Sequence, residues 1–174
     1  MKKVLFLDRD GVICRAMPRG EYLTSLDQWE LMPGIVELLE AARQAGYLAV
    51  VVTNQSAVNR GLLKTETLTE IHDYMKNQLR DPFTAIYQCP HVDQDMCECR
   101  KPKPGMMLQA AQDLGVNLAE SLIVGDSHKD VLAGRAAGVG LTVFLRNEHN
   151  EHERERCEPH HTVDDLREVI PFLS

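Results

Sequence analysis

Five short apolar runs alternate with segments of helical pattern along this chain, and this alternation limits the fold more than any other feature. Unbroken apolar runs of this length are typical of strands that are buried on both faces of a parallel sheet. Their alternation with helices predicts an α/β fold, a doubly wound, Rossmann-like parallel sheet covered by helices on both sides. The five runs lie at residues 4–7, 48–52, 85–88, 122–124 and 141–145.

Apolar residues at helical spacing mark the segments between the runs. Ile35, Leu38, Leu39 and Ala42 share one face of a helix that we expect to follow Pro33-Gly34 and to end at Gly46. Further predictions are helices at 66–79, 106–114, 130–137 and 164–172, a short flap at 14–31 and a polar surface loop at 147–161.

Length and composition fit one soluble domain that spans residues 1–174, with 44% apolar residues. No apolar stretch approaches the roughly 20 residues that cross a bilayer, and the short apolar run after Lys2-Lys3 does not resemble a signal peptide. The formal charge of −7 argues against nucleic-acid binding, which usually needs a basic face. We expect a cytoplasmic monomer with neither a membrane nor a nucleic acid as partner.

Two carboxylates, Asp8 and Asp10, follow the first apolar run directly and stand one residue apart. Residues two apart on a strand point to the same side, so both can reach one small volume. Like charges at that separation repel each other unless a cation or a shared proton relieves them. The pair therefore suggests a divalent metal and an anionic substrate, and the alternative is a turn with two solvated acids.

Other polar residues follow neighbouring runs. In parallel sheets ligands bind outside the carboxyl ends of the strands, where Asp8, Thr53 and Asp126 should meet. Such a group suits phosphoryl transfer, with Asp8 as nucleophile and Asp10 as the proton carrier. Thr53 and Lys101 would contact the phosphoryl oxygens. Magnesium, which prefers oxygen ligands, would be held by Asp8, Asp10 and Asp126.

Four short motifs occur in order along the chain. They are Asp8-Arg9-Asp10-Gly11, Thr53-Asn54, Lys101, and Gly125-Asp126 with Asp130 behind it. Each motif is weak alone, but together, on the expected elements, they resemble the haloacid dehalogenase superfamily of phosphatases. The resemblance covers most of the chain and implies the fold of that superfamily. Only a short flap follows Asp10, and the helix after Thr53 leaves no room for a large cap domain. It also implies a magnesium-dependent phosphomonoester hydrolase that forms an aspartyl-phosphate.

A narrower resemblance is carried by Thr53-Asn54-Gln55-Ser56, Arg60-Gly61, Cys89-Pro90-His91 and Cys97-Glu98-Cys99-Arg100-Lys101-Pro102. These segments are similar to the branch of the superfamily that contains heptose bisphosphate and histidinol phosphatases. The resemblance implies a small phosphorylated metabolite as substrate, and it favours Lys101 over Lys103 as the motif-three lysine. Val12 stands where the heptose enzymes usually carry threonine, which we expect to affect packing. The substrate contacts implied are Asn54, Gln55, Ser56, Arg60 and Arg100.

Two substrates remain open. The leading prediction is removal of the C7 phosphate of D-glycero-D-manno-heptose 1,7-bisphosphate, which the resemblance implies. The short gap from His91 to Cys97 is more similar to the histidinol-phosphate enzymes, so that activity is the alternative. A catalytically silent, zinc-stabilised binding module is a third hypothesis, but it predicts the loss of a motif acid, and none is missing. A phosphotransferase or mutase would need a large cap to hold the intermediate away from water, and the sequence predicts none.

Three of the five cysteines cluster with a histidine in the segment 89–99, hereafter the cysteine loop. Cys89, His91, Cys97 and Cys99 offer three thiolates and one imidazole, a set suited to tetrahedral structural zinc. The alternative is a group of ordinary buried thiols beside an exposed histidine. The odd number of cysteines argues for a metal in a reducing compartment over a disulfide framework.

The remaining histidines, cysteines and arginines gave weaker predictions. Four histidines in and beside the polar loop could form a second metal site, although we expect them to be solvated. Cys14 and Cys157 have no evident partner in the sequence. Several arginines could attract a phosphorylated substrate or be surface charges. The histidines are His149, His152, His160 and His161, and the arginines are Arg9, Arg15, Arg19 and Arg60.

Overall fold

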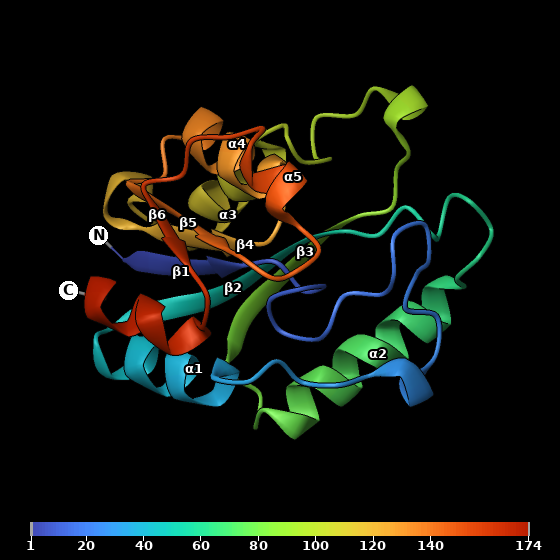
Figure 1. Cartoon of the computed structure of the whole chain (residues 1–174), viewed down its shortest axis with the longest axis horizontal. Coiled ribbons are helices and arrows are strands. Elements are labelled where there is room, and N and C mark those ends of the chain that lie inside the picture. Colours follow the sequence, from blue (N-terminus) through green and yellow to red (C-terminus); the bar gives the residue numbers. More distant parts are fainter. Residues whose placement is uncertain (1, 174) are drawn as a thin grey trace.

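A computed structural model describes residues 2–173 and contains one sheet of six parallel strands in the order β3-β2-β1-β4-β5-β6 (Figure 1). The chain starts in the middle of the sheet, builds outward to one edge and then returns to build the other edge. The predicted doubly wound parallel sheet is therefore confirmed. The strands are β1 (Lys3–Leu7), β2 (Tyr47–Asn54), β3 (Phe83–Cys89), β4 (Leu122–Gly125), β5 (Leu141–Leu145) and β6 (His161–Val163).

Helices cover both faces of the sheet (Figure 1). The α-helices are α1 (Ile35–Gln44), α2 (Thr65–Gln78), α3 (Gly105–Leu114), α4 (His128–Ala137) and the short α5 (Glu151–Arg154). The 3-10 helices are Leu26–Gln28, Asp93–Asp95, Leu118–Glu120 and Leu166–Phe172. Among the described residues, no helix combines the length and the apolar character that a membrane span requires.

Alternation along β1 divides the interior into two cores. Leu5 and Leu7 face α1 and pack with Leu38, whereas Phe6 faces α3 and packs with Met107. Because successive strand residues point to opposite faces, an unbroken apolar strand supplies both cores at once. This double burial explains why the run reads as continuously apolar and ends sharply at Asp8.

The flap, residues 14–31, packs against α2 and does not form a large cap. Cys14 and Leu23 lie in a third apolar cluster with Leu68 and Ile71 of α2. The indole Nε1 of Trp29 donates a hydrogen bond to the side-chain carbonyl of Gln78 at 2.9 Å. The flap is thus a short cover beside the strand ends, as the sequence predicts.

The region after β5 differs from the prediction of a surface loop at 147–161. It contains α5 and leads directly into β6, and both Asn150 and Cys157 are buried. β6 has only three residues on the edge of the sheet, which is too short to give a recognisable apolar run. The predicted final helix at 164–172 is a 3-10 helix, with Pro171 inside it.

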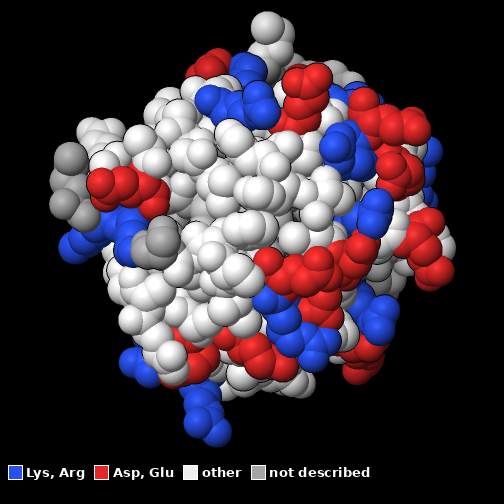
Figure 2. Space-filling view, turned by 60° about the vertical axis from the view of Figure 1, so that its left-hand side comes forward, with Lys and Arg blue, Asp and Glu red and all other residues white. Residues whose placement is uncertain are grey.

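One end of the sheet has an uncharged surface. The end where both termini lie presents an area without charged side chains, and acidic and basic residues are interspersed around it (Figure 2). The parallel strands all run away from this end (Figure 1). The polar residues predicted to form a site therefore lie at the opposite end, beyond the carboxyl ends of the strands.

Candidate active site

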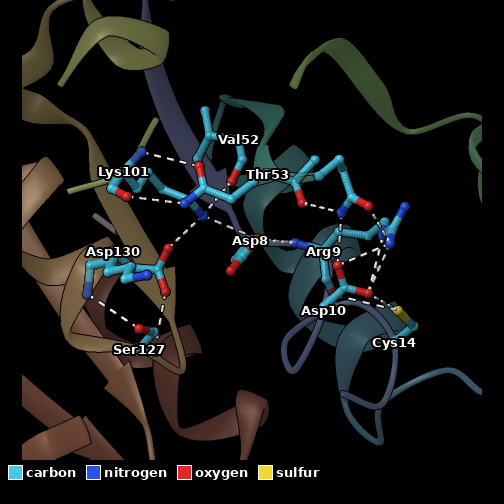
Figure 3. A network of polar contacts seen from close by, with 12 residues as sticks. Asp8, Arg9, Asp10, Cys14, Val52, Thr53, Lys101, Ser127 and Asp130 are labelled. Atoms are coloured by element: carbon cyan, nitrogen blue, oxygen red, sulfur yellow. Dashed lines mark hydrogen bonds and ion pairs between the residues drawn. The ribbon is translucent and has the colours of Figure 1, made fainter. Parts of the chain in front are cut away.

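Asp8 lies at the carboxyl end of β1, in the centre of the sheet. Its main-chain N–H donates to the carbonyl of Val124 on β4 at 3.1 Å, which fixes its position relative to the neighbouring strand. Its Oδ1 accepts hydrogen bonds from the main-chain N–H of Arg9 at 2.7 Å and from Nζ of Lys101 at 3.1 Å (Figure 3). The carboxylate is thus held by one strand end, one turn and one buried cation.

Lys101 is a buried cation, with 2% of its side chain exposed. Its Nζ also donates to Asp130 at 2.6 Å and to the carbonyl of Val52 at 2.7 Å. The side chain of Asn54 bonds both the N–H and the carbonyl of Lys101, each at 3.0 Å. Lys103 lies outside and pairs with Glu98 at 2.9 Å, so the structure brings Lys101 and not Lys103 beside Asp8.

Asp126 follows β4, and its carboxylate lies close to those of Asp8 and Asp130. Ligand oxygens of these three residues lie within 4.8 Å of one another, a separation that one metal ion can span. The turn after β1 approaches Asp126 so closely that a Cβ on Gly11, whose φ is +85°, would lie 2.0 Å from its Oδ2. The sequence predicts Asp130 only as a residue behind the Gly125-Asp126 motif, yet its carboxylate belongs to this group of possible metal ligands.

Burial dominates the electrostatics of these carboxylates. It raises the pKa of Asp8 to about 7 against the lowering effect of Lys101, and it raises the pKa of Asp126 well above the usual range. Burial acts in the opposite direction on Lys101, but the ion pairs with Asp130 and Asp8 raise its pKa. Three crowded carboxylates share one lysine, so a divalent cation fits here because it would relieve their remaining repulsion.

Asp10 is turned away from Asp8 toward Arg9 (Figure 3). Its two oxygens accept bonds from the guanidinium of Arg9 at 2.9–3.2 Å. The amide nitrogen of Gln55 donates to Asp10 and to the hydroxyl of Thr53, both at 2.8 Å. The thiol of Cys14 lies 3.7 Å from Asp10. Thr53 and Asp10 are therefore linked through one buried amide.

Arg9 and His72 were not recognised as parts of this network. Arg9 is 1% exposed, so its interpretation as a surface charge is wrong, and its attraction of a substrate stays a prediction. Its Nη1 lies 3.3 Å from Nε2 of His72 on α2. Since arginine can only donate, that ring nitrogen accepts. Burial and the Arg9 cation lower the pKa of His72 to about 4, which keeps the ring neutral. The only sequence signal for His72 is that it is a polar residue next to the apolar face of α2.

The other predicted substrate contacts lie around these residues with different exposure. Gln55 and Ser56 are buried, whereas Arg60 is exposed. Nε of Arg100 donates a hydrogen bond to Oδ1 of Asp93 at 2.7 Å. Nη1 of Arg100 is buried without a hydrogen-bond partner. Roles of these residues in binding stay predictions. Two further arginines, Arg15 and Arg19, are exposed on the flap.

The cysteine loop brings together all four of its predicted ligands. Their ligand atoms lie within 4.8 Å of one another. The Sγ atom of Cys89 is 3.6 Å from that of Cys97 and 3.0 Å from that of Cys99, and Nδ1 of His91 is 3.3 Å from Cys99. Burial raises the pKa of Cys97, but hydrogen bonds from the N–H of Arg100 and from Cys99 and Cys89 together outweigh it and lower the pKa to about 7. The donor set fits one tetrahedral metal ion.

The remaining histidines and thiols lie in separate places. His149 and His152 pair with Glu148 and Glu153, each at 3.4 Å, while His160 contacts Thr142 and His161 stacks on Phe172. Within residues 2–173, only the cysteine loop and the three carboxylates form groups of possible metal ligands. Cys14 and Cys157 are buried free thiols.

Comparison with known proteins places this geometry in a family. The family model of haloacid dehalogenase-like hydrolases matches residues 2–138. A solved structure of D,D-heptose 1,7-bisphosphate phosphatase from B. bronchiseptica, complexed with magnesium and phosphate, has a TM-score of 0.89 and 34% identity. The similarity covers 98% of this chain and 97% of that chain. The chain therefore belongs to the haloacid dehalogenase-like hydrolases, and among them it is a phosphatase.

Two curated relatives narrow the comparison. The D-glycero-beta-D-manno-heptose-1,7-bisphosphate 7-phosphatase of Pasteurella multocida is 38% identical over 84% of this chain and 83% of its own. The D-glycero-alpha-D-manno-heptose-1,7-bisphosphate 7-phosphatase of Burkholderia mallei is 36% identical over 99% of this chain and 94% of its own. These relatives are named for opposite anomers, so the likeness does not favour one anomer. The predictions of an enzyme and of its superfamily are confirmed.

Proposed function

We propose that this phosphatase hydrolyses a phosphomonoester through a phosphoryl group carried on Asp8. The observation that carries the proposal is the ion pair between Asp8 and the buried Lys101, beside Asp126 and Asp130. The free oxygen of Asp8 would attack phosphorus in line with the leaving oxygen, so that the ester bond breaks as the acyl-phosphate bond forms. Lys101 would neutralise the phosphoryl oxygens during both steps.

Asp10 would carry the proton in this proposal. It would protonate the leaving oxygen in the first step and take a proton from the attacking water in the second. In the structure its carboxylate is held by Arg9 and Gln55, so it must release part of this pairing to reach the leaving group. Thr53, joined to the same Gln55 amide, would donate its hydroxyl hydrogen to a phosphoryl oxygen.

Magnesium would be held by the carboxylates of Asp8 and Asp126, with the main-chain carbonyl of Asp10 as a further ligand. Asp130 would orient Lys101, to which it is bonded, and its oxygen lies within the same group. When bound, the cation supplies positive charge that lowers the repulsion between Asp8 and an anionic phosphate. The crowding of three carboxylates around one lysine supports this assignment.

Zinc is proposed for the cysteine loop, where four side chains fill a tetrahedral set and leave no position for substrate. The metal would therefore be structural. The loop leads directly into Arg100 and Lys101, so a metal that holds the loop would also help to hold these two residues in position. The position of Lys101 beside Asp8 supports this link between the loop and the active site.

The proposed substrate is D-glycero-D-manno-heptose 1,7-bisphosphate, which would lose its C7 phosphate. The names of the two relatives described above support it, and both anomers belong in the test. Histidinol phosphate is the second candidate, because the gap between His91 and Cys97 is short. The short flap would leave room for either small metabolite.

Steady-state assays with magnesium and each compound test the substrate. We expect the highest kcat/KM for one of the two heptose anomers, and phosphorus NMR of the product should show the C1 phosphate retained and the C7 phosphate released. A kcat/KM for histidinol phosphate far above both anomers would reject the heptose proposal in favour of the second candidate.

A further inference from the structure

The segment after β5 packs against the loop that carries Asp126, about 24 residues earlier in the chain. Asn150 is buried, and its side-chain nitrogen donates to the main-chain carbonyl of Asp126 at 2.9 Å and to that of Leu145 at 2.9 Å. Its Oδ1 accepts from the N–H of Asn147 at 2.8 Å. One amide thus ties the end of β5 to the residue that follows β4.

A second contact comes from Glu153, one turn later in α5. Its Oε2 accepts from the hydroxyl of Ser127 at 2.9 Å and from the main-chain N–H of His128 at 3.3 Å, and it pairs with the ring of His128. Ser127 is the N-cap of α4, where a negative charge is favourable. Glu153 therefore holds the two residues that come directly after Asp126.

The loop has little freedom on its other side. A Cβ on Gly125 would lie 2.1 Å from the Cβ of Asp130, and Gly11 approaches Asp126 even more closely. Asp130 itself accepts from the N–H of Ser127 at 3.1 Å through Oδ2, while its Oδ1 binds Lys101. The main chain at Asp126 and the two residues after it is thus held on both sides, and Asn150 and Glu153 supply the contacts on one of them.

We propose that Asn150 and Glu153 are positioning residues that hold the Asp126 loop in the geometry required for a divalent cation. Neither side chain belongs to the group of candidate ligands, so both would act through the residues they bind. Outer partners of this kind orient ligands before the metal arrives, and their loss typically weakens metal binding about 10- to 100-fold. The inference rests on the proposed magnesium site and assigns a role to a segment outside the sequence motifs.

The test measures binding of Mn²⁺, as a probe for the magnesium site, by electron paramagnetic resonance of the purified protein without substrate. The variants are Glu153→Gln and Asn150→Ala, and Glu155→Gln is the matched control because Glu155 is exposed in the same segment. We expect each of the two variants to raise the Kd for Mn²⁺ about tenfold or more, and the control to leave it unchanged. The magnesium concentration for half-maximal turnover should rise in parallel, while kcat at saturating magnesium stays close to that of the unaltered protein.

Several results would overturn the inference. A Kd equal to that of Glu155→Gln in both variants would do so, and so would a fall in Tm without any change in Kd. If Asn150→Ala fails to fold, the Kd of the conservative Glu153→Gln decides alone. Mn²⁺ binding that is absent from the unaltered protein, or that survives Asp126→Asn, would overturn the proposed magnesium site and the inference with it.

Discussion

The carboxylates beyond β1 and β4 lie on the ends of buried parallel strands, whereas the thiols of the cysteine loop extend from the end of β3 into the segment beyond the sheet. The first group contains a resident cation, because Lys101 is bonded to Asp8 and Asp130. The second group consists of three thiols and one imidazole, and Cys97 and Cys99 pack beside the apolar core that contains Cys89. One candidate metal site therefore already holds a positive charge beside its carboxylates, whereas a metal at the other would itself join β3 to the segment that follows it.

This difference separates two consequences of losing a metal. At the carboxylate site, the strands and Lys101 should keep the geometry, so the chemistry should fail while the fold persists. At the cysteine loop, a bound metal would contribute to folding directly, because it would join a ligand on β3 to ligands on the segment that follows. The contrast predicts different signatures in activity, metal content and stability.

The largest expected effect comes from Asp8→Asn. Removing the proposed nucleophile should lower kcat on the order of 10⁴-fold or more, while the protein stays folded and keeps its zinc. Turnover, thermal unfolding and zinc content measured on one sample check this. Asp27→Asn, on the exposed surface, is the matched control. Substantial turnover in Asp8→Asn would contradict the proposed chemistry of the carboxylate site.

Cys97→Ser tests the cysteine loop. Loss of a thiolate should lower zinc affinity by more than about tenfold, since even outer partners of metal ligands have effects of that size. Zinc content, kcat/KM and unfolding should all change together, because the loop leads into Arg100 and Lys101. Cys157→Ser, a buried thiol away from the cysteine loop, should retain its zinc. Full turnover in a zinc-free protein with magnesium restored would show that the loop does not support the active site.

Gly11→Ala examines how tightly the carboxylate site is packed. The left-handed conformation at φ +85° costs an alanine roughly 1–2 kcal/mol. Gly46→Ala is the control, because Gly46 has φ +78° with open space around its Cβ position. Urea unfolding should show a larger loss for Gly11→Ala, and only this variant should lose turnover, because its methyl group collides with Asp126. Equal losses in both variants would contradict the close approach.

The smallest effect at neutral pH is expected from His72→Gln, which should change stability only at acidic pH. The folded pKa of about 4 lies below the unfolded value of 6.5, so the unfolded chain binds the proton more readily. The stability associated with a neutral His72 is present above pH 6.5 and is lost as the pH falls through 4. Glutamine keeps an acceptor for Arg9 without titrating, so it should spare at most about 3 kcal/mol of this loss.

Unfolding curves between pH 4 and 7 measure that difference against His149→Gln, which changes an exposed histidine. If the two variants show the same pH dependence as the unaltered protein, His72 is not held neutral beside the Arg9 cation. Such a result would not change the interpretation of Asp8 and Lys101. The comparison between the carboxylate site and the cysteine loop would then depend on these two residues and not on Arg9.

Much of the fold was predictable because buried strands and amphipathic helices leave periodic signals. The runs that became β1, β2 and β4 also placed Asp8, Thr53 and Asp126 at one edge of the sheet. β6 was missed because three residues at a sheet edge carry no period. The polar segment 147–161 predicts a loop, because the burial of Asn150 depends on contacts with Asp126, distant in sequence, and leaves no local signal.

The interior of the site was less predictable than its motifs. The sequence does not show that Arg9 turns inward, because its neighbours Asp8 and Asp10 give no information on which way the guanidinium points. Its partner His72 comes from α2, 63 positions later. Pairings of this kind depend on the tertiary approach of α2, and a local pattern cannot encode them.

The most direct test of the account is to trap the phosphoryl group on the enzyme. Asp10→Asn should slow hydrolysis of the intermediate, and an aryl phosphate with a good leaving group should form it with less need of an acid. After an acid quench, mass spectrometry of the peptides should find one phosphoryl group on Asp8. Asp8→Asn should carry none. A phosphoryl group on a different residue, or turnover by Asp8→Asn at the rate of the unaltered protein, would contradict Asp8 as the nucleophile.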